Sequence, residues 1–126
     1  MTSEPGKPVK ITLVEDDPMM RSVLKTLLEI EGFKVFLMPD RKTLDELLAC
    51  LKEASPDLVL LDVHLRSLNG IDLLKRIRAE EGFGSLKVIM SSGMDMKDQC
   101  LKAGADGFLM KPYMPDELMK ALRGLN

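Results

Sequence analysis

The chain has 126 residues, 45% hydrophobic and 30% charged, which suits one domain with a hydrophobic core. Its net charge is −2 and it has no basic block, so direct binding of nucleic acid is not expected. No apolar stretch approaches the roughly 20 residues of a membrane span and the chain does not start with a signal peptide, so we expect a cytoplasmic protein that does not enter the membrane.

Short apolar runs alternate with helical patterns along the chain. Residues 1–8 contain two prolines and polar residues, and are expected to form a flexible tail before one domain over 9–126. Three of the apolar runs lack a clean apolar–polar alternation, which is typical of parallel strands buried on both faces. The runs predict strands over residues 10–14, 34–38, 57–61, 87–91 and 107–110.

Between these runs, apolar residues recur with the i, i+3, i+4, i+7 spacing of amphipathic helices. The pattern covers residues 20–28, 44–51, 71–77 and 118–125. Strands that alternate with helices predict an α/β fold, in which a parallel sheet has helices on both faces. In such sheets the functional site lies at the carboxyl ends of the strands.

Several residues predict where the helices begin. Asp17 is expected to cap a helix that starts at the proline after it. Asp40 and Asp95 are candidate caps of two later helices. Pro115 resembles a first-turn proline, but Met114 before it is a weak hydrogen-bond acceptor. The two cysteines, at positions 50 and 100, are expected to be reduced thiols, and with one histidine they give no zinc spacing.

Charged and polar residues collect where the strands should end. Like charges side by side cost free energy unless a cation lies among them. Hard carboxylate oxygens suit Mg²⁺, and a strand-end aspartate can be a nucleophile that becomes phosphorylated while a hydroxyl and an ammonium hold the phosphoryl oxygens. The residues concerned are Glu15, Asp16, Asp17, Asp62, Ser91, Ser92 and Lys111.

These segments resemble the response-regulator receiver domain, the phosphoacceptor module of two-component signalling. The resemblance covers about residues 9–124 and lies in LVEDD, LLDVHLRSLNG, IMSSG and AGADGFLMKPY, in this order. It implies a flavodoxin-like, doubly wound (βα)5 fold with strand order 2-1-3-4-5. It also implies that the chain is not an enzyme beyond weak autophosphorylation and autodephosphorylation.

The resemblance implies a role for each acid. Asp62 corresponds to the phosphorylated aspartate, which receives its phosphoryl group from a phosphohistidine of a sensor histidine kinase or phosphotransfer protein. Asp16 corresponds to a direct ligand of Mg²⁺ (or Mn²⁺), and Glu15 to a second acid that often acts through water. Asp62 itself and the backbone carbonyl of His64 complete the expected metal ligands.

Further residues match the switch and the phosphoryl pocket of this family. Lys111 corresponds to the invariant lysine, and its bond to Pro112 is expected to be cis. Ser92 corresponds to the residue that follows the phosphoryl group, and Phe108 to the aromatic switch residue. Gly70 matches the turn glycine after the phosphorylation loop.

The family's usual partner surface comprises helix 4, strand 5 and helix 5. Here it is rich in methionine, and only twelve positions separate Ser92 from Gly104, so we expect a short helix 4 that starts close to Asp95. Expected partners are a downstream protein or a missing output domain, with a homodimer as a further option. Because the sequence starts with Met1, we expect a stand-alone or N-terminal receiver.

Two residues depart from the family pattern. Arg66 stands where the family usually has proline, so the loop should be less rigid; it either approaches the phosphoryl group or stays in solvent. His64 occupies a position that tunes the lifetime of the phosphoryl group, and it acts on that lifetime or is a loop residue without effect.

Three other hypotheses compete with the interpretation of the chain as a phosphoacceptor. A haloacid-dehalogenase-like hydrolase needs a second acid two residues after the nucleophile, where this chain has His64. A flavin carrier needs a phosphate loop after the first strand, where this chain has three acids. The main alternative is a receiver-like docking module that works without phosphorylation.

Overall fold

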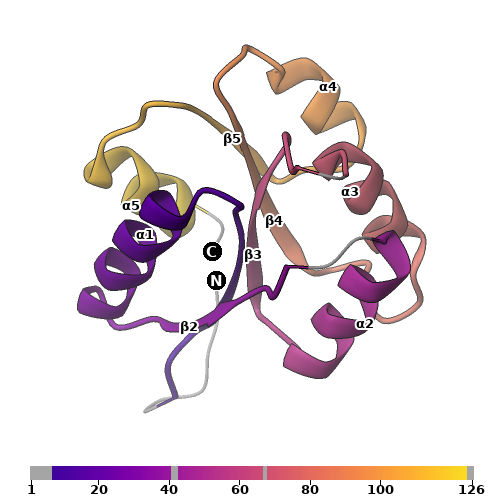
Figure 1. Ribbon diagram of the computed structural model, residues 1–126, viewed down its shortest axis with the longest axis horizontal. Helices are drawn as coiled ribbons and strands as arrows, with labels where there is room; N and C mark the ends of the chain where they lie inside the picture. The colour runs from indigo at the N-terminus through magenta and orange to yellow at the C-terminus, as the bar shows by residue number, and fades with distance from the viewer. Residues whose placement is uncertain (1–6, 41–42, 67, 125–126) are drawn as a thin grey trace.

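The structure is a computed structural model that describes residues 7–40, 43–66 and 68–124. Strands and helices alternate along the chain (Figure 1). The strands are β1 (Lys10–Val14), β2 (Lys34–Leu37), β3 (Leu58–Asp62), β4 (Lys87–Ser92) and β5 (Gly107–Met110). The helices are α1 (Pro18–Ile30), α2 (Leu44–Ala54), α3 (Gly70–Ala79), α4 (Lys97–Lys102) and α5 (Pro115–Arg123). Residues 1–6 of the expected tail and Leu125 of the last helical pattern lie outside the described residues.

The five strands form one parallel sheet in the order β2-β1-β3-β4-β5, as expected. Helices α1 and α5 cover one face, and α2, α3 and α4 lie on the other (Figure 1). The strands begin and end within one residue of their predicted limits. No helix in the described ranges has the length and apolar character needed to cross a membrane.

Burial follows the position of each strand in the sheet. All five residues of β3 are buried, and in β1 and β4 only the first residue is not. The edge strand β2 instead alternates between exposed and half-buried residues. These patterns agree with the sequence, in which the central strands are continuous apolar runs.

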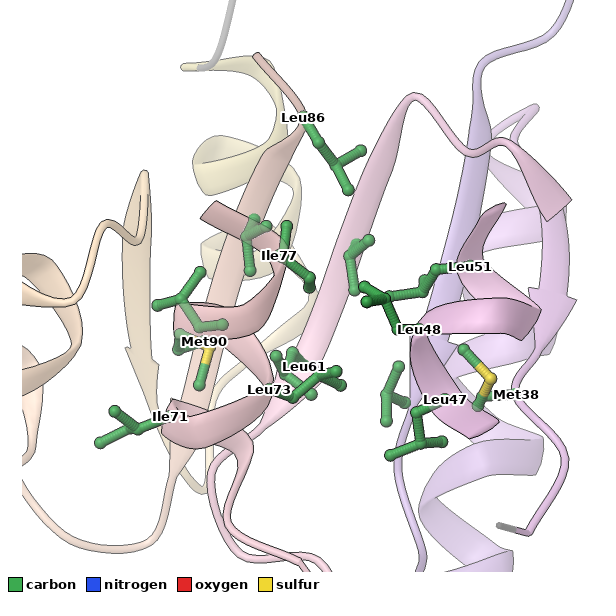
Figure 2. Close-up of a cluster of buried hydrophobic side chains, with 14 of the residues drawn as sticks. Met38, Leu47, Leu48, Leu51, Leu61, Ile71, Leu73, Ile77, Leu86 and Met90 are labelled. Carbon is green, nitrogen blue, oxygen red and sulfur yellow. The ribbon is translucent and has the colours of Figure 1, made fainter. Parts of the chain in front are cut away.

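Each face of the sheet has its own hydrophobic cluster. Ile11, Leu13 and Leu60 pack with apolar residues of α1 and α5. On the other face, Leu61 packs with α2 and α3, whose leucines and isoleucines turn towards the sheet (Figure 2). Burying each such side chain stabilises the fold by about 1.5–3 kcal/mol relative to leaving it in water.

The capping predictions are confirmed for α1 and wrong for α2. The Asp17 side chain accepts hydrogen bonds from the N–H groups of Met19 (2.9 Å) and Met20 (3.3 Å). Asp40 does not cap α2, because the helix begins at Leu44 and the residue directly before it is Thr43. The Thr43 hydroxyl accepts from the Glu46 N–H at 3.1 Å.

In each of the last two helices, the residue in the cap position makes no side-chain hydrogen bond. The expected short α4 is confirmed. Met96, and not Asp95, holds its cap position and makes no capping hydrogen bond, although the Asp95 carboxylate one residue earlier accepts from the Lys97 N–H at 3.4 Å. Met114 before α5 also makes none, as the sequence predicts. Instead, the Glu117 carboxylate accepts from the Met114 N–H at 3.1 Å.

Candidate functional site

The register of the sheet brings the predicted site residues to one edge. Val14 pairs with Leu61, so Glu15 and Asp62 follow neighbouring positions at the carboxyl ends of β1 and β3. Ser92 pairs with the last residue of β5, directly before Lys111. The predicted site residues of four strands therefore meet at the same end of the sheet.

Lys111 joins two of the predicted acids. Its Nζ lies 2.6 Å from Glu15 Oε1 and 3.2 Å from Asp62 Oδ2. The side chains of Glu15 and Asp62 are 5% and 9% exposed, and that of Lys111 is 22% exposed. Two carboxylates thus share one ammonium where water is largely excluded, which makes each charge strongly dependent on the others. The expected cis bond between Lys111 and Pro112 is present.

This arrangement shifts the pKa values of Asp62 and Lys111. Burial and, secondly, the neighbouring Glu15 raise the pKa of Asp62, although Lys111 and the His64 N–H favour its charged form. For Lys111, burial acts to lower the pKa, but the paired carboxylates of Glu15 and Asp62 outweigh it and the net direction is upward. Asp62 is therefore an acid whose negative charge is only partly compensated.

Asp16 is held differently from the other two acids. Its Oδ2 accepts a hydrogen bond from the backbone N–H of Arg66, in the loop between β3 and α3. The side chains of His64 and Arg66 are exposed. Arg21 and Arg66 help to line a pocket of about 180 Å³ that borders Glu15 and Asp16.

The donor set fits a hard divalent cation, although the acids are not gathered around one point. Glu15, Asp16 and Asp62 supply only carboxylate oxygens, the ligands that Mg²⁺ prefers. The charges of the two buried acids exceed that of Lys111, the ammonium they share. Within the described ranges, no group of three or more His, Cys, Asp or Glu side chains is close enough to hold a metal.

The predicted switch residues lie beside the site. Ser92 is fully buried, and its Oγ accepts from the N–H of Met94 at 3.0 Å. Phe108 is half-buried on β5 and packs against the cluster between the sheet and α2–α3. Ser92 pairs with Met110, two residues beyond Phe108, so both expected switch residues lie on adjacent strands.

Position 70 lies so close to the backbone of Asp62 that it has room only for glycine. A Cβ atom at this position would lie 2.2 Å from the backbone oxygen of Asp62. The Gly70 N–H donates to the Val63 carbonyl at 2.6 Å, and the Asn69 side chain caps the same end of α3. The amino end of α3 therefore packs directly against the backbone that positions Asp62.

Two features were not predicted from the sequence: the buried Tyr113 hydroxyl near the site, and the hydrogen bonds of Arg78 at the other end of the sheet. The Tyr113 hydroxyl is buried without a hydrogen-bond partner among the described residues, and burial, together with Glu15 and Asp62, raises its pKa far above the ordinary value. At the opposite end of the sheet, the Arg78 guanidinium donates to the carbonyls of Gly104 (2.9 Å), Leu86 (2.6 Å) and Phe83 (3.3 Å). It also pairs with Asp106 Oδ2 at 2.9 Å. Tyr113 follows the conspicuous Lys111–Pro112 pair, which could have drawn attention to it. In the sequence, Arg78 has the same features as any arginine in the last turn of a helix.

The methionine-rich surface that the sequence indicates is partly exposed. Met94 and Met114 are each 63% exposed and Met110 is 48% exposed. Met96 is half-buried, and Met119 is buried against α1 and the sheet. Three of the five methionines thus face solvent around β5.

Known proteins resemble this chain along most of its length. The family model of the response regulator receiver domain matches residues 11–123. The chain is 36% identical over 116 residues to the DNA-binding response regulator MtrA of Mycolicibacterium smegmatis, covering 90% of this chain and 49% of that protein. It is 33% identical over 119 residues to a nitrate/nitrite response regulator protein homolog of Haemophilus influenzae, covering 91% of this chain and 55% of that protein. The chain thus spans about half the length of these relatives.

Solved structures are similar over almost the whole chain. A putative response regulator from Chloroflexus aurantiacus superposes with a TM-score of 0.84 at 28% identity, covering 94% of this chain and 98% of that one. The receiver domain of sensor histidine kinase PA1611 from Pseudomonas aeruginosa superposes with a TM-score of 0.80 at 26% identity, with the same coverage. That receiver domain has a magnesium ion coordinated in its active site cleft.

Proposed function

Because the chain belongs to the response regulator receiver domain family, we propose that it accepts a phosphoryl group on Asp62 from a phosphohistidine. The donor is a sensor histidine kinase or a phosphotransfer protein. A carboxylate oxygen of Asp62 attacks phosphorus, the bond from phosphorus to the donor imidazole nitrogen breaks, and the imidazole leaves. The contact of Asp62 with Lys111 at the carboxyl edge of the sheet is the observation that supports this role most directly.

The proposed metal ligands are Glu15, Asp16, Asp62 and the backbone carbonyl of His64. When bound, Mg²⁺ or Mn²⁺ neutralises negative charge and orients phosphoryl oxygens, the main requirements of phosphoryl transfer. The surplus of carboxylate charge over Lys111 supports this assignment. Lys111 holds one phosphoryl oxygen through its ammonium, and Ser92 holds another through its hydroxyl. The chain thereby acts as a phosphoacceptor and not as a turnover enzyme.

Phosphorylation is proposed to change the surface formed by α4, β5 and α5. In the structure the Ser92 hydroxyl is bonded to the N–H of Met94, at the start of the loop that leads to α4. A hydroxyl that turns towards the phosphoryl group changes this contact and, with Phe108, biases the surface towards a second arrangement. The partner is a downstream protein, a second copy of the chain, or an output domain of a longer cytoplasmic protein.

A phosphorylation-independent docking module is the second candidate. The observation in its favour is that the acids are already bonded within the protein. Asp16 accepts from Arg66, and Asp62 is paired with Lys111. In this case the same surface binds its partner in one fixed arrangement.

Mass spectrometry of the intact chain separates the two candidates. After incubation with acetyl phosphate and Mg²⁺, we expect the mass to increase by one phosphoryl group. When EDTA is present during the incubation, we expect no increase. Asp62→Ala should abolish the gain, while Asp98→Ala, which removes an exposed acid of α4, should keep it. A folded wild-type chain that gains no phosphoryl group from acetyl phosphate or a phosphorylated histidine kinase would favour the docking module.

A further inference from the structure

In the described structure, Asp16 lacks the cationic partner that the other two acids of the site share. Glu15 and Asp62 are both paired with the ammonium of Lys111. The Oδ2 atom of Asp16 instead accepts a hydrogen bond from the backbone N–H of Arg66, 50 positions further along the chain. This N–H belongs to the loop between β3 and α3. The bond therefore connects the end of β1 to that loop.

The loop that carries the Arg66 N–H is closed by bonds within itself. His64 and Asn69 form an antiparallel bridge, and the Leu65 N–H donates to the Leu68 carbonyl at 3.2 Å. Position 66 thus lies at the tip of a narrow turn, where the backbone sets the direction of its N–H. The exposed Arg66 side chain takes no part in the bond to Asp16. Of the common residues, only proline would remove this donor.

The three acids are close in the fold but do not form a cluster. Glu15 and Asp16 are consecutive, and Glu15 and Asp62 directly follow paired positions on neighbouring strands. Even so, no three His, Cys, Asp or Glu side chains in the described parts of the chain are close enough to hold a metal. To turn towards the other two acids, the Asp16 carboxylate must give up its hydrogen bond. That loss is unfavourable unless a new partner, such as a divalent cation, replaces the N–H.

We propose that the Arg66 N–H is a positioning group that holds Asp16 away from Glu15 and Asp62 in the metal-free chain. Asp16 exchanges this hydrogen bond for a metal contact when Mg²⁺ binds. The N–H and the cation therefore compete for one carboxylate, which lowers the affinity of the site for the metal and frees the β3–α3 loop when the metal is bound. This competition presupposes the proposed metal site, and adds to it a residue that controls its affinity.

The first test measures how fast the Arg66 amide exchanges with water, by NMR of the ¹⁵N-labelled full chain. We expect exchange to become at least several-fold faster when Mg²⁺ is added to saturation, because the amide loses its acceptor. The Lys10 amide is the matched control, because it also donates to a carboxylate, Asp57 Oδ2 (2.8 Å), at the opposite end of the sheet. Its exchange should not change. An Arg66 amide that exchanges equally fast with and without bound Mg²⁺ would overturn the proposal.

Two substitutions at position 66 separate the N–H from the side chain. Arg66→Pro and Arg66→Ala remove the same positive charge, but only the proline variant also loses the donor. We expect Arg66→Pro to bind Mg²⁺ about three- to ten-fold more tightly than Arg66→Ala, measured from the saturable shift of the Asp62 amide. If Arg66→Pro does not fold, the exchange measurement on the wild type decides alone.

The outcomes distinguish the competition from the metal site on which it rests. Equal Mg²⁺ affinities of the two folded variants would overturn the competition and leave the metal site in place. If neither the wild type nor Arg66→Ala nor Arg66→Pro gives a saturable shift with Mg²⁺, the proposed metal site is wrong, and the competition is wrong with it.

Discussion

Lys111 Nζ lies 2.6 Å from Glu15 Oε1, although the two residues are 96 positions apart in the sequence. The contact joins the end of β5 to the end of β1 across the width of the site. Asp62, at the end of β3, is bonded to the same ammonium. The charge balance of this edge therefore depends on one lysine, and changes at any of the three residues should affect the other two.

Removing the ammonium should destabilise the fold. Lys111→Met keeps much of the side-chain length but leaves two buried carboxylates without their cation, and breaking buried pairs typically costs about 3 kcal/mol or more. We expect this loss in urea unfolding at pH 7 without divalent cations, and a smaller loss at pH 4. Lys25→Met removes an exposed helical pair with Glu29 and should change stability by less than about 0.5 kcal/mol. Equal midpoints for wild type and Lys111→Met would contradict the pairing.

The raised pKa of Asp62 predicts a pH dependence with a definite sign. In the folded chain this carboxyl binds its proton more tightly than its ordinary value of 3.8 implies, because of burial and the charge of Glu15. Its contribution to stability is therefore complete below pH 3.8 and is lost as the pH rises through the folded value. Asp62→Asn should be more stable than the wild type at pH 7 in EDTA, with a difference that shrinks towards pH 4. Thermal unfolding at both pH values measures this, and a wild type more stable than the variant at pH 7 would rule it out.

Gly70→Ala should disturb Asp62, the proposed phosphoacceptor, through its backbone. The added Cβ would lie 2.2 Å from the Asp62 carbonyl oxygen, so either α3 or the end of β3 must move. We expect a loss of about 1–3 kcal/mol in stability and slower phosphorylation by acetyl phosphate. Gly84→Ala is the matched control, because no atom of the described residues lies within 4 Å of its added Cβ. Wild-type rates and stability in Gly70→Ala would show that this close approach is not needed.

Arg78→Lys tests the arginine at the other end of the sheet. The guanidinium fork bonds three carbonyls and Asp106, and a lysine ammonium cannot reproduce that geometry. We expect a loss of about 2 kcal/mol in urea unfolding, with phosphorylation retained because the site is distant. Arg76→Lys, in an exposed pair with Asp45, should stay within about 0.5 kcal/mol of the wild type. A similar effect of both substitutions would argue against a special role of Arg78.

The sequence predicted those features that depend on local pattern. Continuous apolar runs identified the buried strands, and Asp17 before a proline identified the start of α1. Asp40 was assigned incorrectly because two short polar residues, Asp40 and Thr43, precede α2, and only the position of the first turn decides that Thr43 is the cap. The strand order itself came from the family resemblance, since periodicity does not specify which strands are neighbours.

The features that sequence did not predict depend on contacts between distant segments. The carbonyls bonded by Arg78 become neighbours only after α3, β4 and β5 have packed. The bond between Asp16 and the Arg66 N–H depends on the path of a loop, for which residue type is a weak guide. Thr12 looks like an ordinary strand residue, and only the structure shows that its buried hydroxyl has no hydrogen-bond partner among the described residues.

Few interactions stabilise helix α4. It has six residues, its cap residue Met96 makes no side-chain hydrogen bond, and Cys100 is its buried residue. Local unfolding of so short a segment exposes little apolar surface, so its free energy should be a small fraction of that for the whole domain. A small change in the hydrogen bonding of Ser92 would then be enough to alter the ratio of folded to frayed α4. The exposed methionines beside the helix would change their surroundings with it.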